Sequence, residues 1–334
     1  MSTTEFDLAN TPAWGKPLIR GRFRVEPEDF QVDESLGFEP EGQGEHWLVQ
    51  IRKRGDNTAW VAGQLAHCAG VGVKDVGYCG LKDRHAVTTQ WFSIYQPRGE
   101  EPRWADLEAQ GIMPLRWARH ERKLRRGQHQ SNHFVIRLRD ITPLESGALE
   151  RLDERLQQIA SNGVPNYFGP QRFGRDGGNL VRARDWLVGG RSIRQRQQRS
   201  MALSAARSWL FNRVLEARVR EGGWRIAMPG EPLAEATGPL WGRGRPLVEG
   251  DALALENEAL APWSDWLPRL EHVGLSQERR ALCLRPEGLT WRREADDLVL
   301  AFGLPPGTFA TAVLAEVAEL DTVSTEAMTA TTVL

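Results

Sequence analysis

The chain has 334 residues, a length typical of two domains. Hydrophobic residues make up 40% and charged residues 26% of it, so the chain can bury a core and lies outside the class of intrinsically disordered proteins. A formal net charge of −1 would argue against a nucleic-acid partner only if the charges were evenly distributed, and they are not.

The elements expected along the chain are short strands and amphipathic helices. Alternating residues predict a half-buried strand over 46–52, with the apolar set Trp47, Val49 and Ile51 on one face. Asn57 is placed to cap the helix that follows. A second alternating stretch, 133–139, predicts another strand. Apolar residues at helical spacing then predict helices over 149–162 and 200–221, separated by loops dense in glycine and proline. The apolar stripe of the second helix is Leu203, Ala206, Leu210, Val214 and Ala217.

Basic residues are concentrated in two segments. Residues 116–139 contain eight basic residues and one acidic residue, and residues 172–225 contain thirteen arginines and four acidic residues. Residues 249–334 have the opposite balance, with fifteen acidic and six basic residues. Clustered basic side chains are what neutralisation of RNA phosphates requires. In the first segment the residues expected to contact phosphates are Arg122, Arg125 and Arg126.

Familiar nucleotide and metal motifs are absent from the sequence. There is no GxxxxGK[ST] phosphate loop, no GxGxxG after a strand, and no HExxH or GxSxG, so chemistry on nucleotide triphosphates or dinucleotides is not expected. His120, His129 and His133 lack an accompanying carboxylate or cysteine, and we interpret them as solvated histidines of an RNA-facing segment. We predict an activity that needs no metal and no added nucleotide.

Cysteine usage indicates a reducing compartment. Cys68, Cys79 and Cys283 are odd in number and widely spaced, which excludes a disulfide framework and a CxxC-type zinc site. No signal peptide is visible, and the longest uncharged run, 298–315, contains two prolines and two glycines that suit a turn better than a membrane helix. We predict a cytoplasmic protein without a membrane partner, with a frayed tail over 321–334.

Residues 76–91, with the sequence VGYCGLKDRHAVTTQW, stand apart. They predict a strand that ends at Gly80, a charged turn and a second strand. The turn places Asp83 between Lys82 and Arg84, and adjacent cations favour the ionised form of an acid. An ionised carboxylate suits a nucleophile or an electrostatic stabiliser. The alternative is a solvated hairpin turn whose charges have no function.

This segment resembles the catalytic motif of the tRNA pseudouridine synthase D (TruD) family, G-x-K-D-[KR]-x-A-x-T-x-Q-x, at every fixed position. Further segments resemble that family in the same order along the chain, from residue 20 to about 315. They are EPEDF at 26–30, NGVPNYFGPQRFG at 162–174, QERRA at 277–281 and GTFAT at 307–311. One departure is Ser131, where the family's G-N-x-F motif has glycine.

The resemblance implies an isomerase without a cofactor that converts uridine to pseudouridine in tRNA, in this family at position 13 of the D-arm. The base is detached from ribose C1′, turned and rejoined through C5, so nothing is oxidised. Asp83 would be the nucleophile, and Phe30, Asn132 and Phe309 would line the pocket of a flipped-out uridine. The sequence leaves open whether Asp83 attacks C1′ or C6, or assists elimination.

Weaker arguments assign supporting roles to three further residues. Arg24 or Lys82 would pair with Asp83, on charge alone. Phe134 would contact the base or, because it alternates with other apolar residues, belong to the core. The sequence alone leaves both interpretations of Phe134 open.

The resemblance implies an α+β architecture. A pseudouridine synthase catalytic domain with a mixed, largely antiparallel sheet would be split by an inserted α/β domain, the TRUD domain, in a V-shaped molecule. In this chain the catalytic domain would comprise 1–160 plus 284–334, and the insertion 161–283. One basic segment would then fall in each domain, giving the RNA a cleft with two basic walls. The expected partner is tRNA, and a monomer is favoured.

Two other classes of protein stay open from the residues alone. A non-catalytic RNA-binding protein would account for the arginine clusters but would leave the surroundings of Asp83 unexplained. A nucleoside hydrolase would account for a carboxylate at a glycosidic bond, but it needs a second carboxyl group, for which Glu28 or Asp29 could be proposed.

Overall fold

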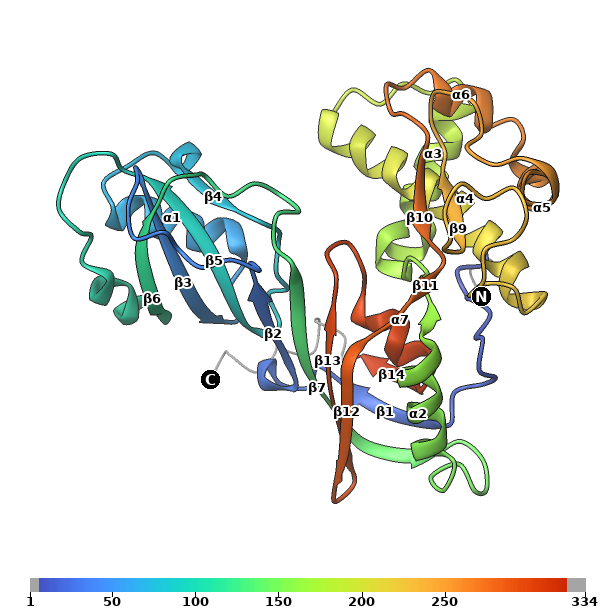
Figure 1. Ribbon diagram of the computed structural model, residues 1–334, viewed down its shortest axis with the longest axis horizontal. Coiled ribbons are helices and arrows are strands. Elements are labelled where there is room, and N and C mark those ends of the chain that lie inside the picture. Colours follow the sequence, from blue (N-terminus) through green and yellow to red (C-terminus); the bar gives the residue numbers. More distant parts are fainter. Residues whose placement is uncertain (1–5, 323–334) are drawn as a thin grey trace, which may run out of the picture. The chain divides into compact units, whose positions relative to one another are not determined.

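The computed structural model describes residues 6–322, and these residues form two compact units (Figure 1). Unit 1 comprises residues 6–17, 153–285 and 308–317. Unit 2 comprises residues 18–152, 286–307 and 318–322. Each unit therefore collects stretches that are far apart in the sequence.

Unit 2 is built on one mixed sheet. Its strands are β1 (Ile19–Phe23), β2 (Phe30–Ser35), β3 (His46–Arg54), β4 (Val76–Tyr78), β5 (Val87–Tyr95), β6 (Ile112–His120), β7 (Ser131–Pro143), β12 (Glu287–Glu294), β13 (Asp297–Leu304) and β14 (Ala318–Thr322). The central order is β12-β13-β7-β2-β5-β3-β6, with β1 paired to β7 and β14, and β4 paired to β5. The β2–β5 and β1–β14 pairs are parallel and the other pairs antiparallel, which confirms the predicted mixed, largely antiparallel sheet.

Helix α1 (Thr58–Cys68) contributes to the apolar core of unit 2. Asn57 caps it as predicted, because its Oδ1 accepts the N–H of Trp60 at 2.8 Å. The buried side chains of Val61 and Leu65 belong to one apolar cluster with those of β3. The residues of β3 in that cluster are the predicted set, Trp47, Val49 and Ile51.

The first part of strand β3 differs from its prediction in being buried on both faces, whereas further along the second face is half-buried at Gln50 and exposed at Arg52. Leu48, which alternates with the residues in the α1 cluster, is fully buried in a second cluster. That cluster includes Trp91 of β5 and Leu124 from the loop between β6 and β7. The half-buried prediction is wrong at this end of the strand, because a distant loop covers the second face at Leu48.

Unit 1 is mainly helical. Its helices are α2 (Leu152–Asn162, whose first residue belongs to unit 2), α3 (Gly178–Leu187), α4 (Arg196–Arg220), α5 (Gly250–Leu260), α6 (Leu267–Glu271) and α7 (Ala310–Ala315). Two short antiparallel pairs join β8 (Val164–Pro165) to β11 (Cys283–Leu284) and β9 (Thr237–Leu240) to β10 (Glu278–Ala281). The 3-10 helices of the two units are η1 (Pro27–Asp29), η2 (Val73–Asp75), η3 (Trp104–Gln110), η4 (Pro170–Phe173), η5 (Arg175–Gly177) and η6 (Ala261–Trp263).

Helix α4 supplies much of the core of unit 1. It begins four residues before the predicted helix, and most of the predicted apolar stripe is buried. The buried stripe residues are Leu203, Ala206, Leu210 and Val214. They share an apolar cluster with Trp209 of the same helix and with Trp266, so α4 is held by burial of a wide apolar face.

Hydrogen bonds join the separate stretches of unit 1. The buried carboxylate of Glu316 accepts the N–H groups of Ala13 at 2.9 Å and Trp14 at 3.1 Å. Arg155 of α2 donates to the carbonyl oxygens of Glu316 at 2.8 Å and Lys16 at 3.3 Å. These bonds hold the amino-terminal stretch and the segment that contains α7 against α2.

The boundaries of the units differ from those of the predicted domains. The resemblance places residues 6–17, 153–160, 284–285 and 308–317 in the catalytic domain, whereas they belong to unit 1. Because these stretches lie outside 161–283, unit 1 is larger than the predicted insertion. An insertion over 161–283 that folds independently stays a prediction.

The carboxyl-terminal part bears on two further predictions. The uncharged run 298–315 contains most of β13 and the helix α7, joined by a turn as predicted. No helix within residues 6–322 has both the length and the apolar character needed to cross a membrane. Of the predicted frayed tail over 321–334, Asp321 and Thr322 end strand β14, and the remainder lies outside the described residues.

Candidate active site

Asp83 lies in the loop between β4 and β5, where the sequence predicts a charged turn. Its side chain is 47% exposed, so solvent and a ligand can reach it. The carboxylate Oδ2 accepts a hydrogen bond from Nη2 of Arg24 at 2.7 Å. Of the two cations considered as partners on charge alone, Arg24 is therefore the one that pairs with Asp83.

Arg24 is held from several sides. Its backbone φ of 59° lies in the left-handed region, which few residues other than glycine adopt. The guanidinium carbon lies 4.2 Å from the ring centre of Phe30 and 4.9 Å from that of Phe23, within range of cation–π attraction. With only 19% of the side chain exposed, Arg24 orients the Asp83 carboxylate without needing a ligand to fix it.

Lys82 does not pair with Asp83, in contrast to one of the predicted arrangements. Its ammonium binds the carboxylate of Glu34 on β2, and the two side chains are 6% and 0% exposed. The other oxygen of Glu34 accepts the N–H of Trp91 at 3.2 Å. A buried carboxylate needs a counter-charge and hydrogen bonds, and this requirement draws Lys82 inward while Asp83 stays at the surface.

Two buried polar side chains hold the backbone of the Asp83 loop. Gln90 of β5 donates from Nε2 to the carbonyl oxygen of Gly80 at 2.6 Å. Thr58 accepts the N–H of Lys82 at 2.9 Å and donates to Oε1 of Gln90 at 3.1 Å. Because each buried group has a partner, the network favours a single conformation of the loop.

Lys53 reaches the same loop from the end of β3. The residue is 1% exposed, and its Nζ donates to the carbonyl oxygens of Asp56 at 2.5 Å and of Asp83 at 3.4 Å. Burial lowers the pKa of Lys53 to about 8. The sequence did contain a signal for this residue, because Lys53 continues the alternation of the buried residues Val49 and Ile51.

Phe30 and Phe134 belong to neighbouring strands of the central sheet. They are 3% and 8% exposed, and their ring centres are 5.9 Å apart. Phe134 also stacks on Phe302 of β13 with ring centres 5.7 Å apart. The structure thus places Phe134 in the core, while Phe30 lies between that core and the guanidinium of Arg24.

Asn132 lies near the start of β7, opposite Glu34 of β2. Its Nδ2 is 3.0 Å from Nε2 of His129. Its Oδ1 is buried and has no hydrogen-bond partner within residues 6–322. A buried carbonyl oxygen without a donor costs free energy, so this position favours a bound group that carries an N–H.

Phe309 lies in unit 1, directly before helix α7. Its ring centre is 6.0 Å from that of Phe168 and 5.6 Å from the guanidinium carbon of Arg172. Of the three residues expected to line a substrate pocket, Phe30 and Asn132 therefore belong to unit 2 and Phe309 to unit 1.

The comparison with known proteins identifies the family. A family model for tRNA pseudouridine synthase D (TruD) matches residues 10–190. The tRNA pseudouridine synthase D of Cellvibrio japonicus is 53% identical over 321 residues, which cover 95% of this chain and 95% of that protein. The chain belongs to the tRNA pseudouridine synthase D family. Its relative from Methylococcus capsulatus is 46% identical, with 92% of this chain and 94% of that protein covered.

A solved structure shares the fold. The crystal structure of a candidate TruD protein from Methanosarcina mazei superposes with a TM-score of 0.70 and covers 92% of this chain and 96% of that one. Only 20% of the residues are identical, so the agreement concerns the fold alone. The predicted α+β class is confirmed by this likeness.

The network under Asp83 gives the fixed positions of the TruD motif a physical meaning. The Lys of the motif is Lys82, which neutralises the buried Glu34, and the Gln is Gln90, which holds the carbonyl of Gly80. Sequence reasoning missed Glu34 and Thr58, because nothing local distinguishes a buried polar residue in a strand or at a helix start. Only their tertiary partners show their positions.

The three histidines were predicted to be solvated, and for two of them this is wrong. His120 and His129 are 5% and 8% exposed, whereas His133 is exposed. His120 stacks on Phe38 with ring centres 5.4 Å apart, and burial lowers the pKa of His129. Within residues 6–322 no group of His, Cys, Asp and Glu side chains is arranged to hold a metal ion.

The basic residues expected to contact phosphates lie in the loop between β6 and β7. Arg122, Arg125 and Arg126 are all exposed. None of them forms an ion pair with a carboxylate of the described chain. Their charges are thus available for a polyanion in this family of RNA-modifying proteins.

We expect the buried pair of Glu34 and Lys82 to stabilise the fold only as a pair. Glu34→Ala leaves a buried ammonium without its counter-charge and should lower the free energy of unfolding by about 3–5 kcal/mol. The double change Glu34→Leu with Lys82→Met should cost less, because no unpaired charge stays behind. Urea unfolding at pH 7 measures both. A reduction below about 1 kcal/mol in Glu34→Ala would show that the ammonium does not depend on this carboxylate.

We expect Lys53 to make stability depend on pH. The folded chain releases the proton of Lys53 near pH 8, whereas the unfolded chain keeps it until above pH 10, as for an ordinary lysine. Between these values the unfolded state binds more protons, so this group makes the free energy of unfolding rise with pH.

The variant Lys53→Met lacks that contribution. Its stability relative to the parent should therefore fall as the pH is raised from about 7.5 to about 10, as followed by urea unfolding. Lys74→Met, at an exposed lysine, is the matched control and should keep a constant difference. A constant difference for Lys53→Met as well would contradict the depressed pKa of Lys53.

Proposed function

We propose that the chain isomerises uridine to pseudouridine at position 13, in the D-arm of tRNA, with Asp83 as the nucleophile. Pseudouridine synthesis in tRNA is the activity named for its relatives. The single observation that carries the assignment of Asp83 is its setting: an accessible carboxylate, bound by Arg24 at 2.7 Å, on a loop whose backbone is held from beneath. Such a setting presents one carboxylate in a fixed position to a substrate.

The reaction needs the target base outside the RNA stack. A flipped uridine would stack on an aromatic ring, for which the half-buried Phe309 is the proposed surface. Phe30, which is 3% exposed and covered by Arg24, would contribute to the pocket by holding that arginine. The buried Oδ1 of Asn132 would accept the N3–H of uracil, which gives this oxygen the partner that it lacks within residues 6–322. These contacts would distinguish uracil from cytosine, which carries no hydrogen at N3.

The proposed chemistry balances without a redox partner. The bond between C1′ and N1 breaks, the base turns, and a bond between C1′ and C5 forms. The hydrogen at C5 leaves as a proton, and N1 of the product carries a proton instead. Asp83 serves each of the three open routes, by adding to C1′, by adding to C6, or by assisting elimination, and no metal or cofactor enters any of them.

The structure gives a physical argument against a nucleoside hydrolase. The proposed second carboxyl groups are both engaged: Asp29 is 0% exposed and accepts Nε of Arg139 at 2.9 Å with both oxygens. Glu28 pairs with Arg54 at 2.5 Å, and this pair lowers the pKa of Glu28. Asp29 cannot reach a substrate from its buried position. A general acid needs a raised pKa, so the lowered pKa of Glu28 does not suit that residue to the second role.

The same proposal covers the compartment, the oligomeric state and the partner of this protein. We infer a cytoplasmic monomer whose partner is tRNA. The free thiols of Cys68, Cys79 and Cys283 support the reducing compartment, since none of them forms a disulfide in the described chain. Within unit 1, residues 161–283 are proposed as the inserted domain, which contributes the second basic segment.

Asp83→Asn should abolish the chemistry and leave tRNA binding largely intact. The change preserves the shape of the side chain but removes its charge and its nucleophilic oxygen, while affinity depends mainly on dispersed phosphate contacts. Tritium release from tRNA labelled at uracil C5 should fall to background, and the dissociation constant should stay within about threefold. Asp33→Asn, at an exposed carboxylate on β2, is the control and should keep the parent rate. Comparable tritium release by a folded Asp83→Asn protein would refute the nucleophile.

The exposed arginines between β6 and β7 should contribute to phosphate binding. Replacing Arg122, Arg125 and Arg126 together by alanine should weaken tRNA binding and flatten the log–log salt dependence by about 2 to 3, since each neutralised phosphate adds about 0.7–0.9 to that slope. The control replaces three exposed arginines of unit 2 that are already ion-paired, namely Arg20, Arg22 and Arg151. An unchanged slope in the first variant would place its three charges away from the RNA.

A further inference from the structure

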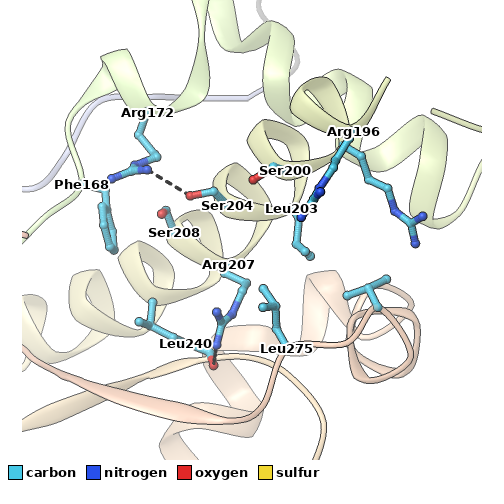
Figure 2. Close-up of a pocket in the computed structure, with 12 residues that line it drawn as sticks. Phe168, Arg172, Arg196, Ser200, Leu203, Ser204, Arg207, Ser208, Leu240 and Leu275 are labelled. Carbon is cyan, nitrogen blue, oxygen red and sulfur yellow. Dashed lines mark hydrogen bonds between the residues drawn. The ribbon is translucent and has the colours of Figure 1, made fainter. Parts of the chain in front are cut away.

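Unit 1 contains a pocket of about 600 Å³ beside helix α4 (Figure 2). One wall is a face of α4, and a second is formed by Phe168 and Arg172, which precede α3. Apolar residues close the remaining side, and they are Leu240, Val273 and Leu275. The volume lies within the range of pockets that hold small molecules or single segments of a polymer.

The face of α4 that lines the pocket is a row of arginines and serines interrupted by one leucine. Figure 2 shows the hydroxyl side chains of this row between Arg172 at one end and Arg196 at the other. Spacings of three and four residues place the whole row on one side of the helix. The row is Arg196, Arg199, Ser200, Leu203, Ser204, Arg207 and Ser208. At 1.5 Å per residue it extends for about 18 Å.

One arginine of the row serves the fold. Arg207 is 11% exposed, and it donates to the carbonyl oxygens of Trp241 at 2.7 Å, Leu240 at 2.8 Å and Ser276 at 2.7 Å. These bonds tie α4 to the strand β9 and to the segment before β10. Arg207 therefore builds the wall of the pocket, and its donors are already used.

Arg172 differs, because it is half-buried without a counter-charge. Nη1 donates to the hydroxyl of Ser204 at 3.0 Å, and the guanidinium lies 5.3 Å from the ring centre of Phe168. No carboxylate of the described chain is among its partners. Burial lowers the pKa of Arg172, and burial together with the charge of Arg172 lowers the pKa of Arg280 to about 10. A half-buried guanidinium without a counter-charge is stabilised when an anion binds beside it.

Arg196 and Arg199 leave further positive charge at the pocket. Both are exposed, and neither forms an ion pair with a carboxylate of the described chain. Arg199 lies 4.9 Å from the ring centre of Trp186, which restricts its side chain. At the other end of α4 the pattern is opposite, since Arg220 pairs with Glu216 at 2.5 Å. Uncompensated charge on α4 is thus concentrated along the pocket.

We propose that this pocket binds consecutive backbone phosphates of the RNA substrate, with Arg196 and Arg199 at its entrance and Arg172 inside. Guanidinium groups bind phosphate oxygens through paired hydrogen bonds, and serine hydroxyls supply further donors. A row of about 18 Å is longer than one phosphate group, so it fits a polynucleotide backbone better than a free nucleotide. The inference rests on the proposed function in one respect, that the RNA is the tRNA substrate.

The test replaces the two exposed arginines by alanine, since their side chains form no hydrogen bond or ion pair within residues 6–322. Arg196→Ala with Arg199→Ala should weaken tRNA binding at least tenfold near 0.1 M salt and reduce the log–log salt slope by about 1.5 to 2. The matched control, Arg220→Ala with Arg245→Ala, removes two exposed arginines of unit 1 outside the pocket. The rate of tritium release at saturating tRNA should be unchanged, since the exchanged side chains touch no reacting atom.

The outcomes separate the two proposals. If the parent protein releases tritium from C5-labelled tRNA but the pocket variant binds tRNA like the control variant, the pocket proposal is overturned and the proposed function stands. Failure of the parent protein to release tritium would refute the proposed function, while the change in salt slope still tests the pocket.

A second measurement tests whether the pocket binds a polynucleotide or a single nucleotide. An oligouridine of eight nucleotides and uridine monophosphate are compared as ligands of the parent and of the pocket variant. The pocket variant should lose affinity for the oligonucleotide by a larger factor than for the mononucleotide, because several phosphates bind along the row. An equal decrease for both ligands would instead indicate a site for a single nucleotide and overturn the proposal.

Discussion

A buried ion pair between Lys82 and Glu34 ties the loop that carries Asp83 to the central sheet. Burying the two charges is unfavourable unless they meet, so the residue before Asp83 has one position in which its charge is neutralised. Gln90 and Thr58 satisfy the backbone groups of the same loop. The position of the exposed carboxylate thus follows from charges and amides that lie beneath it.

Lys82 and Asp83 are adjacent in this loop but have different roles. Lys82 points inward to the fully buried carboxylate of Glu34, and Asp83 points outward to Arg24. Arg24 is in turn packed on Phe30. Because the ring of Phe30 holds the cation that orients the nucleophile, the alignment of the carboxylate depends on Phe30 in the proposed mechanism.

The number of arginines in this protein is larger than the number that contribute free positive charge to its surface. Within the second basic segment, Arg207 binds backbone carbonyls and Arg218 forms a buried pair with Glu231 at 3.1 Å, so both serve the fold. Arg196 and Arg199 carry no such partners in the described chain. The planar guanidinium group, with five donors, suits either role equally well, and only its neighbours decide which role a given arginine has.

Local features were determined by the sequence itself. The cap at Asn57, the alternation of β3 and β7 and the motif around Asp83 depend on residues close together in the chain, so they could be predicted from it. Tertiary structure decided three other features. They are the cation that pairs with Asp83, the burial of Lys53, and the loop that covers the second face of β3 at Leu48. The physical reason is that burial and charge pairing depend on which distant segments meet. A short stretch of sequence does not show which distant segments contact it, because its own periodicity is the same whether solvent or a loop covers its outer face.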